Sequence, residues 1–181
     1  MQYRKILYYL MSWATGKERR VDNILANGDW RFLQLGNYTS ASPLVVNQGS
    51  TSKITFQSNN ISYQAGRDLT INYDYTLQKF TPTTLNDVFL VEVRFKCKCS
   101  TQNGHGDVLL ESPSFVYNPV QAQTITVVRA ANNEQFISVA VPLFIGQDLI
   151  NNGLEVKFSA GAGNFSIYDV SYMIVRLSSG I

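Results

Sequence analysis

The chain has 181 residues, which is enough for one domain with a substantial core. Only 15% of its residues are charged, whereas Ser, Thr, Asn and Gln together make up 54 residues, about 30% of the chain. The apolar fraction of 45% and the net charge of +2 exclude an intrinsically disordered chain. The composition therefore predicts a β-rich domain with a neutral surface of hydroxyl and amide groups.

The basic residues are concentrated near the N-terminus. Residues 1–20 contain five basic residues and one acidic residue, whereas residues 21–181 contain ten basic and twelve acidic residues. A slightly acidic body argues against a nucleic-acid footprint, so no nucleic-acid partner is expected.

Residues 1–22 are predicted to form a helical anchor segment that is separate from the rest of the chain. Residues 3–14 contain no Gly or Pro, and their apolar residues recur with helical spacing. The run is about half as long as a membrane span, so none is expected. Because so short a helix is marginal in water, it has to pack on its own domain, on sister chains or on another protein. We favour an intermolecular anchor, with contacts made by Ile6, Leu7, Leu10, Met11 and Trp13.

Residues 23–181 are predicted to form one antiparallel jelly-roll β-sandwich. From Asp29 onward the helical period disappears, and short runs that alternate between apolar and polar residues are separated by Asn- and Gly-containing breakers. Eight to ten strands without a long helix between them are typical of a two-sheet sandwich. The candidate strands are 30–35, 44–46, 53–57, 69–77, 88–99, 108–110, 124–129, 136–144, 154–159 and 165–177.

Two of these strands show their inward faces especially clearly. In residues 69–77 every odd position is apolar or aromatic, and in residues 88–99 the alternation directs Val91, Val93, Phe95 and Cys97 inward. Cys97 and Cys99 then share a face, about 6.6 Å apart at ~3.3 Å per residue, a separation that disfavours a disulfide. We therefore expect two reduced thiols.

The sequence carries little sign of catalytic chemistry. The single histidine, His105, lies in a Gly-rich run and is expected to be an exposed turn residue. No nucleophile motif, phosphate-binding loop or multi-His metal site is present in the sequence. Glu92 and Glu155 fall at outward strand positions, which is ordinary surface patterning. We expect that the protein is not an enzyme.

Three segments carry distinctive motifs: residues 23–36 (NILANGDWRFLQLG), residues 63–75 and residues 164–172. The first resembles the opening motif, and the other two resemble later strands, of galactose-binding-like β-sandwiches, a group that includes carbohydrate-binding modules and phage fibre and tail-associated virion proteins. In this chain, Asn27, Gly28 and Asp29 form a turn signal, and Trp30 and Phe32 are expected to fill the sandwich core.

The resemblance implies several properties of the site. Sugar binding in this group uses exposed aromatic rings, and the aromatic residues near predicted strand ends are Tyr38, Tyr63, Tyr117 and Tyr168. Acidic residues near the start and end of the domain can hold a structural calcium, with Asp29 and Asp169 in comparable places here. Two candidate ligands are too few for a calcium site, so no cofactor is assigned.

The favoured function is that of a bacteriophage virion structural protein, a small fibre or appendage of the head or tail. It would assemble in the host cytoplasm as a homotrimer, attach to other virion proteins through the N-terminal helix, and display a sandwich that binds host-surface glycan. The alternative is a free-standing carbohydrate-binding module or lectin-like domain. A sandwich-fold glycan hydrolase or lyase would require a cleft that holds two acidic residues.

Overall fold

The computed structural model of the chain describes residues 30–34, 37–56, 61–65, 70–116 and 118–178, and for residues 61–65 it describes the backbone alone. The predicted anchor segment, residues 1–22, and Asp29 lie outside the described residues. Among the described residues, no helix has the length and apolar content needed to cross a membrane.

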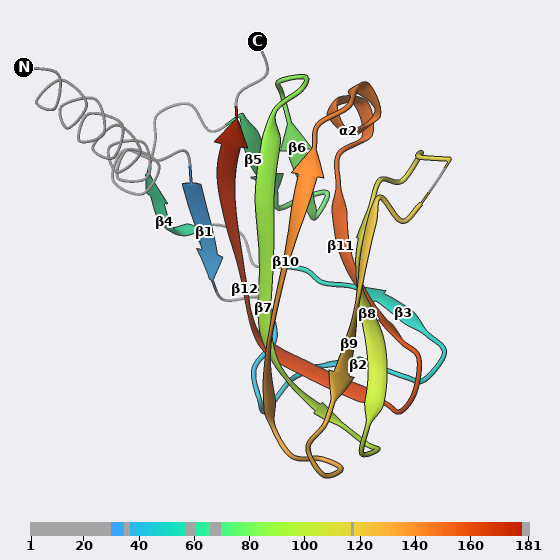
Figure 1. Cartoon of the computed structure of the whole chain (residues 1–181). Helices are drawn as coiled ribbons and strands as arrows, with labels where there is room; N and C mark the ends of the chain where they lie inside the picture. The colour runs from blue at the N-terminus through green and yellow to red at the C-terminus, as the bar shows by residue number, and fades with distance from the viewer. Residues whose placement is uncertain (1–29, 35–36, 57–60, 66–69, 117, 179–181) are drawn as a thin grey trace, which may run out of the picture.

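The described residues form twelve strands and one short helix (Figure 1). Their bounds are β1 (Trp30–Gln34), β2 (Leu44–Val46), β3 (Thr51–Lys53), β4 (Ile61–Ala65), β5 (Ile71–Asp74), β6 (Lys79–Pro82), β7 (Val88–Cys99), β8 (Gly104–Glu111), β9 (Gln121–Val127), β10 (Gln135–Phe144), α2 (Gln147–Asn152), β11 (Glu155–Ala160) and β12 (Phe165–Ser178).

The strands form two packed antiparallel sheets and a hairpin. The first sheet has the order β10-β7-β12-β1-β4, with β2 also paired to β12, and the second sheet has the order β3-β11-β8-β9. Strands β5 and β6 form a separate hairpin. Sequence-distant strands lie side by side, as where β12 pairs with both β7 and β1 (Figure 1). This arrangement confirms the predicted jelly-roll sandwich.

The core lies between the two sheets and follows the alternation of the long strands. Along β7 the buried residues are Phe89, Val91, Val93, Phe95, Cys97 and Cys99. Phe158 of the second sheet packs edge-on against Phe95, with 5.9 Å between the ring centroids. The ring centroid of Phe158 also lies 4.9 Å from that of Phe165, on β12 of the first sheet. The inward positions predicted for residues 88–99 are therefore confirmed.

Both cysteines are buried and carry free thiols. Burial, with a smaller contribution from the neighbouring Cys99, raises the pKa of Cys97 to about 12. Cys97 is therefore protonated at neutral pH and has little nucleophilic character.

The face predicted for β1 is wrong. Leu33 is fully buried, whereas Trp30 and Phe32 are half-buried on the opposite side of the strand. Arg31 shares the inward side with Leu33, and its Nη1 donates hydrogen bonds to the Ile71 carbonyl (3.2 Å) and to Asn72 Oδ1 (2.9 Å). These contacts join the inward side of β1 to the β5–β6 hairpin.

Two glycines explain why β8 is longer than predicted and why His105 belongs to a strand. A Cβ at Gly106 would lie 2.5 Å from Phe158 Cζ, and a Cβ at Gly104 would clash with Cys99 Sγ. The glycine-rich run therefore permits close packing within a strand. His105 is exposed on β8 opposite Thr126, so its prediction as a turn residue is wrong.

The strand predicted for residues 69–77 ends earlier, at Asp74. The carboxylate of Asp74 accepts hydrogen bonds from the N–H groups of Thr76 and Leu77, both at 2.8 Å, which forms a side-chain-closed turn. Strands β4 and β6 and helix α2 were not predicted at all.

Candidate functional site

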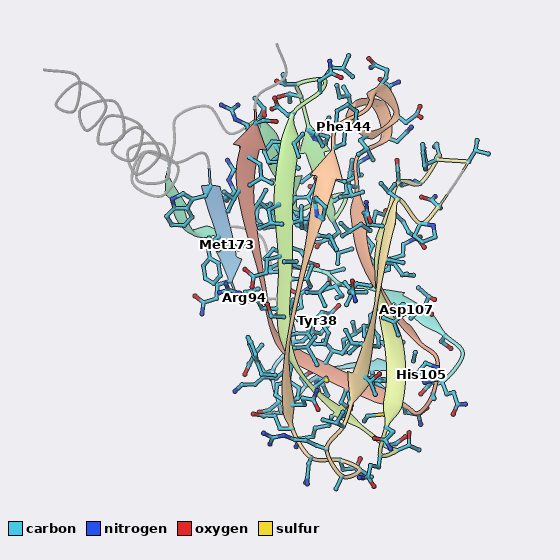
Figure 2. The ribbon with its side chains drawn as sticks, in the orientation of Figure 1. Tyr38, Arg94, His105, Asp107, Phe144 and Met173 are labelled. Atoms are coloured by element: carbon cyan, nitrogen blue, oxygen red, sulfur yellow. The ribbon has the colours of Figure 1, made fainter. Side chains whose placement is uncertain are left out.

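The candidate site is the outer face of the first sheet, the side turned away from the second sheet. Because strand side chains alternate, residues between the buried ones on β10, β7, β12 and β1 project to this face. The face divides into an apolar end and a polar end, each defined below by its residues. Figure 2 shows Phe144 toward the upper end of the sheet, Arg94 lower down and Met173 between them in height.

The apolar end is a continuous row across four strands. Pro142 of β10 pairs with Leu90 of β7, Leu90 pairs with Val175 of β12, and Val175 pairs with Trp30 of β1. Cross-strand partners on one face lie about 5 Å apart, so these side chains contact one another. We define the apolar end as Trp30, Phe32, Val88, Leu90, Pro142, Phe144, Met173 and Val175.

Every residue of the apolar end retains exposed surface. Phe144 is 59% exposed, Pro142 is exposed, and the others are half-buried. Scattered apolar residues are normal on a protein surface, but a contiguous patch over four strands is typical of an interaction site.

The polar end begins at Glu92. Arg94 donates two hydrogen bonds to the Glu92 carboxylate, from Nε to Oε1 at 2.8 Å and from Nη2 to Oε2 at 2.7 Å. Ser138 Oγ donates a third, at 2.5 Å, to Glu92 Oε1. The hydrogen bonds from Arg94 and then Ser138 hold the pKa of Glu92 below its ordinary value, against the effect of burial.

A second ion-pair group lies next along the polar end. Lys96 Nζ lies 3.2 Å from Asp169 Oδ2 and 3.6 Å from Glu134 Oε1. These partners raise the pKa of Lys96, with Asp169 contributing most. We define the polar end as Glu92, Arg94, Lys96, Glu134, Phe136, Ser138 and Asp169.

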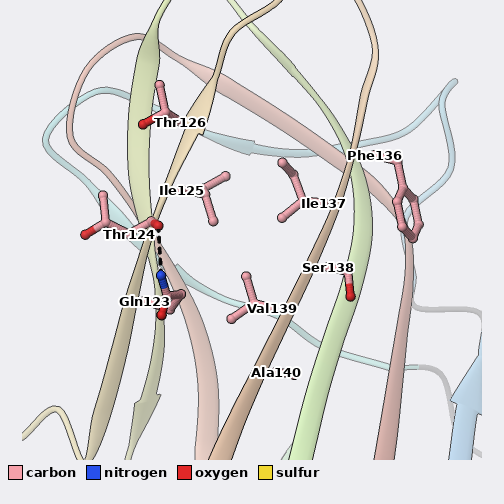
Figure 3. A pocket seen from close by; sticks show the side chains of 9 residues that line it. All are labelled: Gln123, Thr124, Ile125, Thr126, Phe136, Ile137, Ser138, Val139 and Ala140. Atoms are coloured by element: carbon pink, nitrogen blue, oxygen red, sulfur yellow. Dashed lines mark hydrogen bonds between the residues drawn. The ribbon is translucent and has the colours of Figure 1, made fainter.

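The opening between β9 and β10 borders this end (Figure 3). It is a cavity of about 390 Å³ between edge strands of the two sheets. Figure 3 shows Ile137 and Val139 pointing from β10 toward β9, whereas Phe136 and Ser138 lie on the other side of β10. The lining contains hydroxyl, amide and apolar groups and no charged side chain.

Of the four tyrosines predicted to bind sugar, the structure describes the side chains of two, Tyr38 and Tyr168, and neither is fully exposed. Tyr168 is 2% exposed, its hydroxyl donates a 2.6 Å hydrogen bond to Glu134 Oε2, and burial and this bond raise its pKa to about 12. The expectation of an exposed ring at Tyr168 is therefore wrong. Tyr38 is half-buried, with its hydroxyl 2.8 Å from Thr55 Oγ1. Its carbonyl accepts a hydrogen bond from the Asp169 N–H at 3.2 Å, so Tyr38 and the Tyr168 segment are neighbours.

The other two tyrosines cannot be placed as site residues. The side chain of Tyr63, on β4, and the whole of Tyr117 lie outside the described residues. The same holds for the anchor contacts Ile6, Leu7, Leu10, Met11 and Trp13.

A structural calcium, which the resemblance allows but to which no site was assigned, stays untested. Of its two candidate ligands, Asp29 lies outside the described residues, and the Asp169 carboxylate is paired with the Lys96 ammonium. The described residues contain no group of three or more His, Cys, Asp or Glu side chains placed to hold a metal ion.

Sequence reasoning did not single out Phe136 and Phe144, the exposed aromatic residues of this face. The signal was present in residues 135–144, where Ile137, Val139, Val141 and Leu143 mark the inward positions. A phenylalanine at each end of that run falls at the opposite parity and must point outward.

Comparison with known proteins supports the fold. No protein-family model and no curated protein matches the sequence. Among solved structures, Eiger TNF from S. frugiperda is similar with a TM-score of 0.54 and 12% sequence identity, over 84% of this chain and 94% of that chain. PRD1 vertex protein P5 is similar with a TM-score of 0.54 and 8% identity, over 82% of this chain and 97% of that chain. At these identities the likeness shows a shared jelly-roll sandwich.

Proposed function

We propose that this chain is a structural protein of a bacteriophage virion, a small fibre or appendage that assembles as a homotrimer. In this proposal the apolar end of the outer face is the contact between copies. The sandwich is displayed from the particle and binds host-surface glycan, and the protein acts by assembly and binding without catalysis.

The observation that carries the proposal is the apolar end itself. Its residues are not needed to cover the core, because the inner positions of β7, β10 and β12 already supply the side chains between the sheets. Burying the remaining exposed surface of the apolar end against another copy would contribute roughly 25 cal/mol per Å² of apolar area. The patch includes a tryptophan and phenylalanines, which are enriched at interface centres.

Two further features support a virion protein. The vertex protein of PRD1 shares the sandwich over most of both chains. In addition, the predicted anchor of residues 1–22 is basic and precedes the sandwich directly, so it would hold the domain on the particle through Ile6, Leu7, Leu10, Met11 and Trp13.

Light scattering of the full chain tests the trimer. The chain mass is 20.3 kDa, so a trimer has a mass of about 61 kDa. We expect the trimer mass at micromolar concentration, with dissociation only on strong dilution. A mass of 20.3 kDa across the same concentration range would overturn the proposal.

The full chain carrying Leu10→Asp tests the anchor separately. The variant is expected to keep the trimer mass and to be missing from purified virions of a phage that encodes it. Normal incorporation of the variant would show that the N-terminal segment does not attach the protein.

A further inference from the structure

Phe136 is an exposed aromatic ring in polar surroundings. It is 61% exposed and projects from β10 to the outer face, with Lys96 as its partner on β7. Ser138 follows on the same face of β10 and pairs with Arg94. An apolar ring with a hydroxyl, a guanidinium and an ammonium around it is suited to a ligand that has one apolar face and several hydroxyl groups.

The polar groups around Phe136 are held in place before any ligand arrives. The Glu92 carboxylate is fixed by two hydrogen bonds from Arg94 and one from Ser138. Because the Ser138 hydroxyl donates its proton to Glu92, its lone pairs remain to accept a hydrogen bond from outside. Groups fixed in this way lose little conformational freedom when a ligand binds.

The charges of this region balance. The polar end holds two basic and three acidic side chains, and the adjacent Lys98 acts on Glu134 and brings the count to three of each, so the surface has no net charge that would favour an anionic ligand. The six residues are Arg94, Lys96, Lys98, Glu92, Glu134 and Asp169.

The opening between β9 and β10 lies on the other side of β10 from the Phe136 ring. Its volume of about 390 Å³ exceeds that of ten water molecules at about 30 Å³ each. The cavity borders Phe136 and Ser138 and, across the opening, Thr124 and Thr126. Figure 3 shows that the hydrophobic Ile137 and Val139 form the β10 side of the opening, so the Phe136 ring faces open surface on the opposite side of β10.

We propose that Phe136, with Ser138 and the Glu92–Arg94 pair, binds a neutral sugar residue of a glycan, and that the ring stacks on the apolar face of the sugar. The proposal rests on the glycan-display part of the proposed function and gives it a site other than the predicted tyrosines. The ligand class is a neutral hexose or N-acetylhexosamine, because its hydroxyl groups match the mixed donors and acceptors and it requires no net charge.

Phe144 provides a matched control on the same strand. It lies eight residues farther along β10 on the same face and is exposed to a similar extent, 59% against 61%. Its neighbours are apolar, so the trimer proposal assigns it to the contact between copies. The two phenylalanines should therefore separate sugar binding from assembly.

The experiment begins with the full chain on a printed array of neutral, sialylated and phosphorylated oligosaccharides. Calorimetric titration with the strongest-binding neutral oligosaccharide in solution follows. Solution titration is required because trimers gain apparent affinity on an array through multivalency. We expect array binding to neutral oligosaccharides.

The variants then locate the site. Phe136→Ala is expected to weaken binding by at least about tenfold, equivalent to about 1.4 kcal/mol, and Phe136→Tyr, which keeps a ring, is expected to bind within about threefold of the parent. Phe144→Ala is expected to leave the affinity per chain unchanged while weakening the trimer. Thermal unfolding of each variant confirms that it is folded.

Three outcomes would overturn the site, and each can be told apart from failure of the trimer proposal. Unchanged affinity in folded Phe136→Ala would place sugar binding elsewhere. Preference for sialylated or phosphorylated glycans would contradict the charge argument. A full-length trimer that binds none of the neutral glycans would refute the site and leave the assembly proposal intact.

Discussion

The inner faces of the two sheets both supply the hydrophobic core, but their outer faces differ in the side chains they carry. On the second sheet, ion pairs cross the strands, with Lys53 Nζ 2.7 Å from Glu155 Oε1 and Lys157 Nζ 2.7 Å from Glu111 Oε2. On the first sheet, an apolar row from Pro142 to Trp30 crosses the corresponding strands. An antiparallel sandwich can leave both outer faces in water, so the fold alone does not require an apolar outer face.

Leu109, on the outer face of the second sheet, can be compared directly with Leu90 on the outer face of the first. It lies half-buried on the outer face of β8, with Lys157 opposite on β11 and the small Ala122 opposite on β9. Its surroundings show that an outward leucine on this protein need not belong to an apolar patch. Leu90, by contrast, has an apolar cross-strand partner on each side, Pro142 on β10 and Val175 on β12. The two outer faces therefore differ in whether their apolar residues are contiguous, which supports the proposal that the first sheet meets a partner.

The largest expected effect comes from placing a charge on each face in turn. Leu90→Glu buries an unpaired carboxylate in the proposed contact, so we expect the trimer dissociation constant to rise about 100-fold or more. Leu109→Glu places the same group near the Lys157 ammonium and is expected to leave the trimer intact. Sedimentation of both full-length variants at equal concentration makes the comparison. If both variants dissociated, or if neither did, the two faces would not differ as proposed.

An intermediate effect is expected from acid. Hydrogen bonds from Arg94 lower the pKa of Glu92, and at Glu155 the opposing effect of burial is outweighed by hydrogen bonds from Lys53 and Lys157. A carboxyl group whose folded pKa is depressed stabilises the fold above its unfolded pKa, here 4.5, and this contribution is lost as the pH falls through the lower folded value. We therefore expect the melting temperature to fall below about pH 4.5.

Glutamine variants separate the two faces in acid. Glu92→Gln and Glu155→Gln should each flatten the acid dependence of melting, measured by circular dichroism at one fixed chain concentration. Glu92 lies at the border of the proposed contact, as the cross-strand partner of Met173 in the apolar end, so its protonation should also lower the trimer mass. The Glu155→Gln variant should retain the parent's acid dependence of mass. Acid dissociation that is unaltered in Glu92→Gln would show that Glu92 does not influence the contact.

The smallest effect is expected on the second sheet. Lys157→Met removes the ammonium that lies 2.7 Å from Glu111 and 3.3 Å from Glu155, and partly exposed pairs contribute only about 0.2–1 kcal/mol each. Urea unfolding should therefore show a loss of about 1 kcal/mol or less that shrinks as salt is added. A loss several times larger would mean that this polar face contributes far more to stability than ordinary surface ion pairs.

Much of the strand pattern could be predicted because alternation is a local property. The bounds of β2 and β7 agree with the predictions, and the inward residues of β7 are the expected ones. Strands β4 and β6 have only five and four residues, too few for their alternation to stand out, and helix α2 has only six residues, so none of them was predicted. Asp74 ended β5 through a side-chain turn that alternation does not register.

The site was harder to predict because exposure depends on what covers a residue. Tyr168 lies near a strand end, as an exposed ring would, but Glu134 and Lys96 lie over its strand and its ring is buried. Phe136 had the right parity for exposure, yet its polar neighbours on β7 come from a strand about forty residues away. Pairing between distant strands creates such surroundings, and one sequence does not specify that pairing.

The sequence by itself determined that the chain is a β-sandwich, which residues of each long strand share a face, and that the two thiols lie together. Period-two alternation follows from backbone geometry, so these properties are local. Only the tertiary structure decided that Trp30 and Phe32 turn outward, that an apolar row crosses four strands, and that Phe136 stands among balanced charges. These properties depend on which strands pair and which face they cover, and residues far apart in the sequence decide both, as where β1 pairs with β12.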